Sequence, residues 1–124
     1  MFNLLLIGSG AREHAIAHKL SQSPIQHSLW VWPANPVTAT KWELAHLPLN
    51  ASHLDLVQFC KEHSIDAVIV GPETPLAEGL ADILQQNAVP CFGPTKQAAQ
   101  LESSKAFAKK LMVEANIPTA KFEI

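Results

Sequence analysis

The chain has 124 residues, of which 48% are hydrophobic and 16% are charged, and its formal net charge is −2. This length suits one domain, and the apolar content is typical of an α/β protein whose central strands are covered on both faces. The scattered Lys and Arg residues form no basic patch for DNA or RNA, and the N-terminus has the pattern of neither a signal peptide nor a membrane span. We therefore expect a cytoplasmic protein with no nucleic-acid partner and no membrane contact.

Residues 3–20 are predicted to form a strand, a glycine turn and a helix. The apolar residues 4–7 precede Gly8-Ser9-Gly10-Ala11, and strong helix formers follow from Arg12. Glycines lack a Cβ, so backbone N–H groups of the turn and of the helix start can point at a negatively charged group. This predicts a phosphate or sulfate site at the amides of residues 9–12. The alternative is that the glycines only allow a tight turn.

The turn departs from the dinucleotide-binding fingerprint. Glu13 stands in place of the third glycine, and the second strand, residues 28–32, ends in Trp32-Pro33 with no carboxylate for a ribose. NAD is therefore disfavoured. His14 and His18 share a helical face but have no third ligand in view, so we expect no metal there.

The loop of residues 33–38 leaves the carboxyl end of the second strand, where open α/β sheets place ligands. Two prolines stiffen it around Asn35, although it could equally be a surface connector. Residues 42–49 are ambiguous and could form a short edge segment. A helix follows, capped by Asn50 or Ser52 and ending near Ser64.

Residues 65–70 are rich in β-branched side chains and almost wholly apolar, which predicts a central strand. Glu73 follows its carboxyl end between two prolines, in a position to orient a substrate or, alternatively, to stabilise the next helix through its dipole. The remaining predicted elements are a helix over 76–86, a strand over 90–92, helices over 96–101 and 105–115, and strand-like alternation over 121–124. Cys60 and Cys91 are expected to be free, buried thiols.

Four motifs occur in a fixed order along the chain: Gly8-Ser9-Gly10-Ala11-Arg12-Glu13-His14-Ala15, Val70-Gly71-Pro72-Glu73, Cys91-Phe92-Gly93-Pro94-Thr95, and Gln100-Leu101-Glu102-Ser103-Ser104-Lys105-Ala106-Phe107. Together they resemble glycinamide ribonucleotide synthetase, also called phosphoribosylamine-glycine ligase, of the ATP-grasp superfamily. That enzyme joins phosphoribosylamine to glycine with ATP in purine biosynthesis. The resemblance covers the whole chain and implies a Rossmann-like open parallel sheet with flanking helices. It divides the chain into a pre-ATP-grasp domain, residues 1–102, and the truncated start of the ATP-grasp module, residues 103–124.

The resemblance also implies roles for individual residues. Those expected to bind phosphoribosylamine are Gly8, Ser9, Gly10, Ala11, Arg12, Glu13, Asn35, Thr38, Pro72 and Glu73. A bidentate guanidinium such as Arg12 suits a phosphate or ribose oxygen, but Arg12 could instead pair with a nearby carboxylate. Lys105 resembles the first lysine that contacts ATP, or it is a solvated helix residue. ATP and Mg²⁺ or Mn²⁺ are cofactors of the full-length enzyme, and we expect neither to bind tightly to this chain.

The chain departs from the family pattern at Ala11, where the family has glycine, and in the loop Pro33-Ala34-Asn35-Pro36-Val37-Thr38, where two glycines are replaced. If those glycines take positive φ in the family, this loop must follow another path. No nucleophile–base pair is apparent, so no catalytic residue is assigned. Three functions therefore remain: the substrate-side domain of a ligase, a stand-alone phosphate- or nucleotide-binding module, or a degenerate homologue that acts through a partner.

Overall fold

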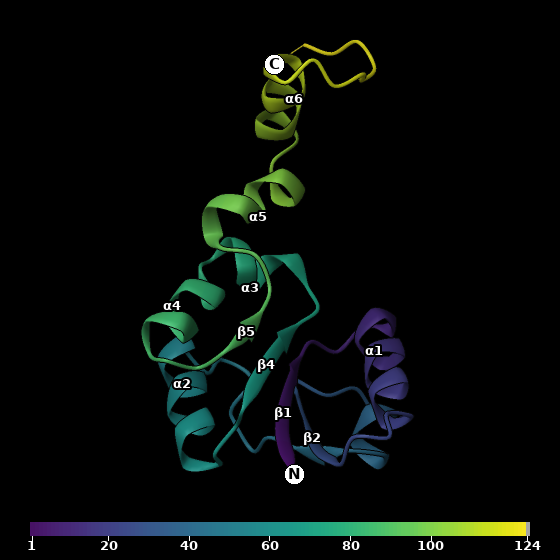
Figure 1. The fold of residues 1–124 in the computed structure, drawn as a ribbon, viewed down its shortest axis with the longest axis vertical. Helices are drawn as coiled ribbons and strands as arrows, with labels where there is room; N and C mark the ends of the chain where they lie inside the picture. The colour runs from purple at the N-terminus through teal and green to yellow at the C-terminus, as the bar shows by residue number, and fades with distance from the viewer. Residues whose placement is uncertain (124) are drawn as a thin grey trace.

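The computed structural model describes residues 1–123, which form an open, five-stranded parallel sheet flanked by helices (Figure 1). The spatial order is β3-β2-β1-β4-β5, and every neighbouring pair is parallel. The strands are β1 (Phe2–Ile7), β2 (His27–Trp32), β3 (Glu43–Leu44), β4 (Ala67–Val70) and β5 (Cys91–Phe92). The predicted parallel α/β sheet is therefore confirmed, and the ambiguous stretch 42–49 supplies its edge strand β3.

The central strand β1 explains the unbroken apolar run near the N-terminus. Its residues pair with β2 on one side and with β4 on the other, as Leu4 does with Leu29 and Ala67. Leu5 and Ile7 belong to one hydrophobic cluster and Leu6 to another, because successive side chains of a strand point to opposite faces. Both faces of β1 are covered over its second half, so residues 4–7 are all apolar.

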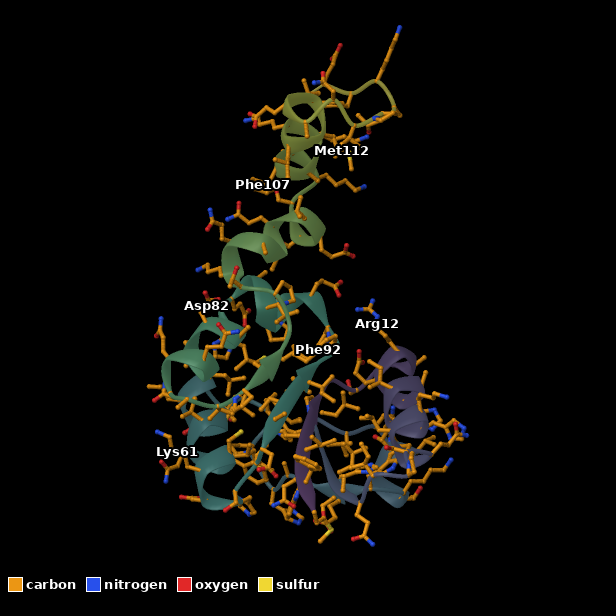
Figure 2. The ribbon with its side chains drawn as sticks, in the orientation of Figure 1. Arg12, Lys61, Asp82, Phe92, Phe107 and Met112 are labelled. Carbon is orange, nitrogen blue, oxygen red and sulfur yellow. The ribbon has the colours of Figure 1, made fainter. Side chains whose placement is uncertain are left out.

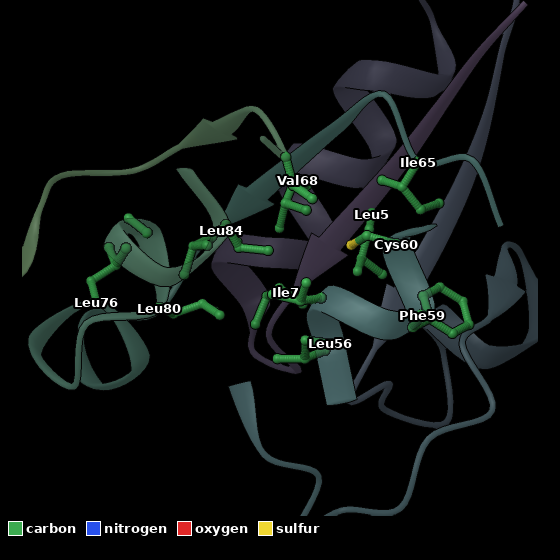
Figure 3. Close-up of a cluster of buried hydrophobic side chains, with 14 of the residues drawn as sticks. Leu5, Ile7, Leu56, Phe59, Cys60, Ile65, Val68, Leu76, Leu80 and Leu84 are labelled. Carbon is green, nitrogen blue, oxygen red and sulfur yellow. The ribbon is translucent and has the colours of Figure 1, made fainter. Parts of the chain in front are cut away.

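The helices cover both faces of the sheet. On one face lies α1 (Ala11–Ser21), whose Ala17 packs with Leu6 and Val31, and the short 3₁₀ helix η1 (Thr38–Thr40) follows β2 in the chain. On the other face, α2 (His53–Glu62) and α4 (Leu80–Gln86) pack on β1 and β4, as Figure 3 shows for Leu56, Cys60 and Leu84 around Leu5 and Val68. The remaining helices are α3 (Glu73–Ala77), α5 (Lys96–Ser103) and α6 (Lys105–Glu114).

Three predictions about local structure are wrong. The single helix over 76–86 is two helices, because α3 begins at Glu73 and Gly79, with φ of +100°, separates it from α4. Residues 121–123 form no strand, and Ile124 lies outside the described residues. Cys91 is only partly buried, whereas Cys60 is buried as predicted.

Both cysteines are free thiols, and desolvation by the surrounding apolar side chains raises the pKa of each to about 11. A thiol is reactive only as the thiolate, so neither is a candidate nucleophile near neutral pH. Among the helices of residues 1–123, none combines the length and the apolar character that crossing a membrane requires.

Candidate functional site

The carboxyl ends of β1, β2 and β4 open onto a cleft with a volume of about 510 Å³. The chain first places β2 and β3 on one side of β1 and then places β4 and β5 on its other side. The cleft therefore lies where the strand order reverses. Open α/β sheets bind ligands at such a position. The lining residues are Ile7, Gly8, Ser9, Gly10, Glu13, Trp32, Pro33, Leu49, Ala51, His53, Leu56, Pro72, Thr74, Pro75, Glu78 and Leu80.

Glu13 occupies the glycine turn at the floor of the cleft. Its Oε2 accepts a hydrogen bond of 2.7 Å from the Gly10 amide, and the residue is only 5% exposed. A Cβ on Gly8 or Gly71 would collide with the Glu13 side chain, so these two glycines leave room for it. The Gly10 amide is thus already engaged, and an anion site at the amides of Ser9, Ala11 and Arg12 stays a prediction.

Arg12 and Glu73 pair beside the cleft. The Arg12 Nη1 donates to the Gly71 carbonyl at 2.9 Å and to Glu73 Oε2 at 3.3 Å, which links α1 to the start of α3. The side chains are 62% and 48% exposed, so the pair contributes little to stability. The backbone amide of Glu73 and the Arg12 guanidinium hold the pKa of the Glu73 carboxyl below its usual range. The pairing of Arg12 with a carboxylate is thus the alternative that the structure bears out, and the guanidinium keeps further N–H donors for a ligand.

The opposite wall of the cleft was not predicted from the sequence. His53 begins α2 directly after Ser52, whose hydroxyl accepts from the Asp55 amide at 3.1 Å. The Nε2 atom of His53 lies 3.7 Å from Oε2 of Glu78, the residue that directly follows α3. The capping signal at Ser52 locates the start of α2, but nothing in the sequence indicates that this start faces the strand ends.

Asn35 and Thr38 organise the loop of residues 33–38 and do not line the cleft. The Asn35 side chain accepts from the amides of Val37 and Thr38 and donates to the Ser9 carbonyl at 2.8 Å. Thr38 is buried, and its hydroxyl bonds to the backbone of Asn35. Within residues 1–123, no residue of this loop has positive φ, so the loop does not require glycine at the two replaced positions. Asn35 binds the loop to the glycine turn.

Lys105, the residue expected to contact ATP, lies apart from the cleft. Lys105 is exposed at the first position of α6, which projects from the body in Figure 1. No group of three or more His, Cys, Asp or Glu residues within 1–123 is placed to hold a metal ion. His14 packs edge-on against Trp42 with ring centroids 5.6 Å apart, and His18 contacts the Gln22 amide.

The comparison with known proteins decides the family. The family model described as "Phosphoribosylglycinamide synthetase, N domain" matches residues 2–102. The chain belongs to this family. The predicted resemblance is therefore confirmed, and the first two of the four motifs that carried it meet at the cleft.

Sequence relatives cover nearly all of this chain. A phosphoribosylamine–glycine ligase of Neisseria meningitidis serogroup B is 49% identical over 120 residues, which is 97% of this chain and 28% of the relative. The trifunctional purine biosynthetic protein adenosine-3 of Homo sapiens is 49% identical over 121 residues, which is 97% of this chain and 12% of the relative. The chain thus spans 28% of the length of the first relative and 12% of the length of the second.

Solved structures share the fold at low sequence identity. A phosphoribosylamine–glycine ligase from Thermotoga maritima superposes with a TM-score of 0.68 at 24% identity, covering 98% of this chain and 27% of that chain. A biotin carboxylase domain of a thermophilic 2-oxoglutarate carboxylase superposes with a TM-score of 0.69 at 20% identity, covering 96% of this chain and 29% of that chain. These two similarities establish the architecture of the sheet and its helices.

The predicted site residues fall into three groups. Gly8, Ser9, Gly10, Glu13 and Pro72 line the cleft, and Arg12 and Glu73 pair beside it. Ala11 begins α1, and Asn35 and Thr38 hold the neighbouring loop. Lys105 lies apart on α6.

Proposed function

We propose that this chain is the part of a phosphoribosylamine–glycine ligase that receives phosphoribosylamine. One observation carries this proposal: the motifs at residues 8–15 and 70–73 meet at the cleft where the strand order reverses. The cleft volume of about 510 Å³ is within the range of small-molecule sites. Membership of the family suggests phosphoribosylamine as the substrate, and we expect it to bind in the cleft.

The proposed reaction joins the amine of phosphoribosylamine to the carboxyl group of glycine, with ATP cleaved to ADP and phosphate. The cleft would hold the amine substrate, while ATP, Mg²⁺ and glycine would bind to the ATP-grasp domains of the full-length enzyme. On this proposal the pre-ATP-grasp domain ends near residue 102, and Lys105 is the first residue to reach ATP. The exposure of Lys105 leaves its ammonium group available for such a contact.

A chimera tests the proposal. In the Neisseria meningitidis ligase, the matching 120 residues are exchanged for this chain, and product formation is measured with ATP, Mg²⁺, glycine and freshly made phosphoribosylamine. We expect the chimera to form glycinamide ribonucleotide. The isolated chain should neither hydrolyse ATP nor form product, because such chemistry requires a phosphate cradle and metal-binding carboxylates.

Two controls separate the alternatives. The parent ligase gives the full rate, and the parent without its matching residues gives the background. A folded chimera at the background rate would indicate a degenerate homologue or a stand-alone binding module. Product from the isolated chain would show that these 124 residues are an enzyme by themselves.

A further inference from the structure

The face of the sheet that α1 covers is open at β5. Phe92 pairs with Ile69 across β5 and β4, and Ile69 packs in the same cluster as Leu6, together with residues of α1. Cys91 belongs to the other cluster, because successive side chains of a strand point to opposite faces. Phe92 therefore points to the face that α1 covers, yet it is 77% exposed. The helix α1 packs over β1 and β2 and leaves β5 uncovered.

Phe92 is part of an apolar surface and not an isolated exposed residue. Ile69 lies beside it on the neighbouring strand, and Ala67 precedes Ile69 by two residues on the same face. Both are partly buried. We call Ala67, Ile69 and Phe92 the open face, and Figure 2 shows Phe92 near the carboxyl end of the sheet, below α6. Because parallel sheets are normally covered on both faces, the open face indicates a surface on which another part of a protein packs.

The geometry of β5 favours packing against side chains over the addition of a strand to the sheet. This edge strand contains only Cys91 and Phe92, with Pro90 before it and Pro94 two residues after it. Proline has no N–H group to donate to an added strand, and short edges flanked by proline resist such pairing. Recognition at the open face therefore depends on the Phe92 ring and the aliphatic side chains next to it.

The segment that follows β5 indicates which partner packs there. The helix α5 begins at Lys96, four residues after Phe92, and leads into α6, which has no buried residue. Leu111, Val113 and Ile117 are exposed as well, so the open face and this segment both present apolar side chains. The matched part of the Neisseria meningitidis ligase is 28% of that protein, so most of such a ligase lies outside the match. A domain joined through α5 and α6 is held near the open face at a high effective concentration, whereas a second copy must arrive from solution.

We propose that the open face is a docking surface for the ATP-grasp domains of the ligase, which cover Phe92 with apolar side chains of their own. This inference rests on the proposed function and adds the surface through which the two parts of the enzyme are held together. The Phe92 ring is then buried in the full-length enzyme, although it is exposed in the isolated chain.

Thiol labelling of Phe92→Cys with a maleimide tests the docking. The rate is measured in the isolated chain and in the chimera with the Neisseria meningitidis ligase, and the rate of the same protein without the substitution is subtracted. Cys60 and Cys91 contribute little to this background, because the pKa of each is raised to about 11. We expect the new thiol to react at least about tenfold more slowly in the chimera, because a covered thiol reacts only when the contact opens.

The matched control is Leu54→Cys. Leu54 is 66% exposed on α2, which covers the opposite face of the sheet, so its thiol should react at the same rate in both proteins. A second pair of variants measures stability. Phe92→Ser should lower the urea midpoint of the chimera and leave that of the isolated chain nearly unchanged, whereas Leu54→Ser should change neither.

Equal labelling of Phe92→Cys in the chimera and in the isolated chain would overturn the inference. Protection that grows with the concentration of the isolated chain would also overturn it, because the occupant would then be a second copy. If Phe92→Cys does not fold, hydrogen exchange of residues 90–95 in the unsubstituted proteins decides, with slower exchange expected in the chimera. An inactive chimera with a protected thiol would contradict only the ligase assignment, and an active chimera with an accessible thiol would contradict only the docking.

Discussion

The sheet body, residues 2–92, and the C-terminal arm, residues 96–123, differ in the contacts that stabilise them. In the body, residues 2–92, strands and helices enclose a core in which Leu5, Leu80 and Leu84 are fully buried. In the arm, α6 has no buried residue, and Val113 and Ile117 are 59% and 50% exposed. Figure 1 shows α6 rising away from the sheet, with α5 at its base. The body therefore carries the stability of the chain, whereas the arm depends on local helix contacts.

The base of the arm is the point where the two regions are joined. Ala99 of α5 is buried, and Asp82 of α4 accepts a hydrogen bond of 2.6 Å from the Lys96 amide. The Thr95 hydroxyl caps α5 by accepting from the Ala98 amide at 3.2 Å. These contacts with the body end at α5, so α6 is held by its own hydrogen bonds and by local contacts such as those of Lys109 with Thr119 and Phe122.

Truncating a leucine of the body should give the largest effect. Leu5→Ala removes a fully buried side chain and leaves a cavity, so we expect the free energy of unfolding to fall by about 2–5 kcal/mol. The matched variant Leu111→Ala on α6, where the side chain belongs to an exposed residue, should change it by less than about 0.5 kcal/mol. Urea denaturation of both variants measures the difference. Equal losses would show that the arm shares the core.

Filling the space beside Glu13 should give the second-largest effect. In Gly71→Ala the added Cβ meets the Glu13 side chain, and overpacking of this kind costs about 1–3 kcal/mol of the free energy of unfolding. Removing the obstacle should relieve the cost, so Gly71→Ala is expected to be milder in a Glu13→Ala background. A double-mutant cycle by denaturation measures this coupling, and an additive result would mean that the floor of the cleft rearranges easily.

Two helix caps give the smallest effect and compare the regions directly. Ser52→Ala removes the cap of α2 in the body and should lower the global free energy of unfolding by about 1 kcal/mol. Ser104→Ala removes the cap of α6, where the hydroxyl accepts from the Phe107 amide at 3.2 Å. We expect it to speed amide hydrogen exchange within α6 and to leave global unfolding unchanged. A lower global free energy of unfolding in Ser104→Ala, with no change in Ser52→Ala, would contradict this division between body and arm.

Most of the sheet was predictable because its strands carry apolar runs bounded by glycine and proline. The split between α3 and α4 was not, because Leu76, Leu80 and Leu84 keep a spacing of four across the break. A glycine within a helix costs only about 1 kcal/mol, so Gly79 alone does not mark an end. Its left-handed conformation is visible only in the folded chain, where the Lys96 stem lies nearby.

The candidate site was predictable only where it follows strands. Gly8 directly follows β1 and Pro72 is the second residue after β4, so their place at one edge of the sheet follows from parallel pairing. His53 and Glu78 come from helix ends whose positions depend on how α2 and α3 pack, which no local pattern encodes. The sequence also indicated an open glycine turn, whereas the Glu13 side chain reaches back three residues to the Gly10 amide, as in a capping box, and occupies the turn.

The position of β1 at the centre of the sheet has a consequence for synthesis on the ribosome. Leu4 pairs with Ala67, so one edge of β1 lacks its partner until β4 has emerged from the exit tunnel. An apolar strand with an open edge is a template for pairing with another chain. The helix α1 and strand β2 follow β1 directly and cover its other face and edge first. Slowing translation between residues 33 and 66 should therefore lengthen the time in which a nascent chain is prone to aggregate.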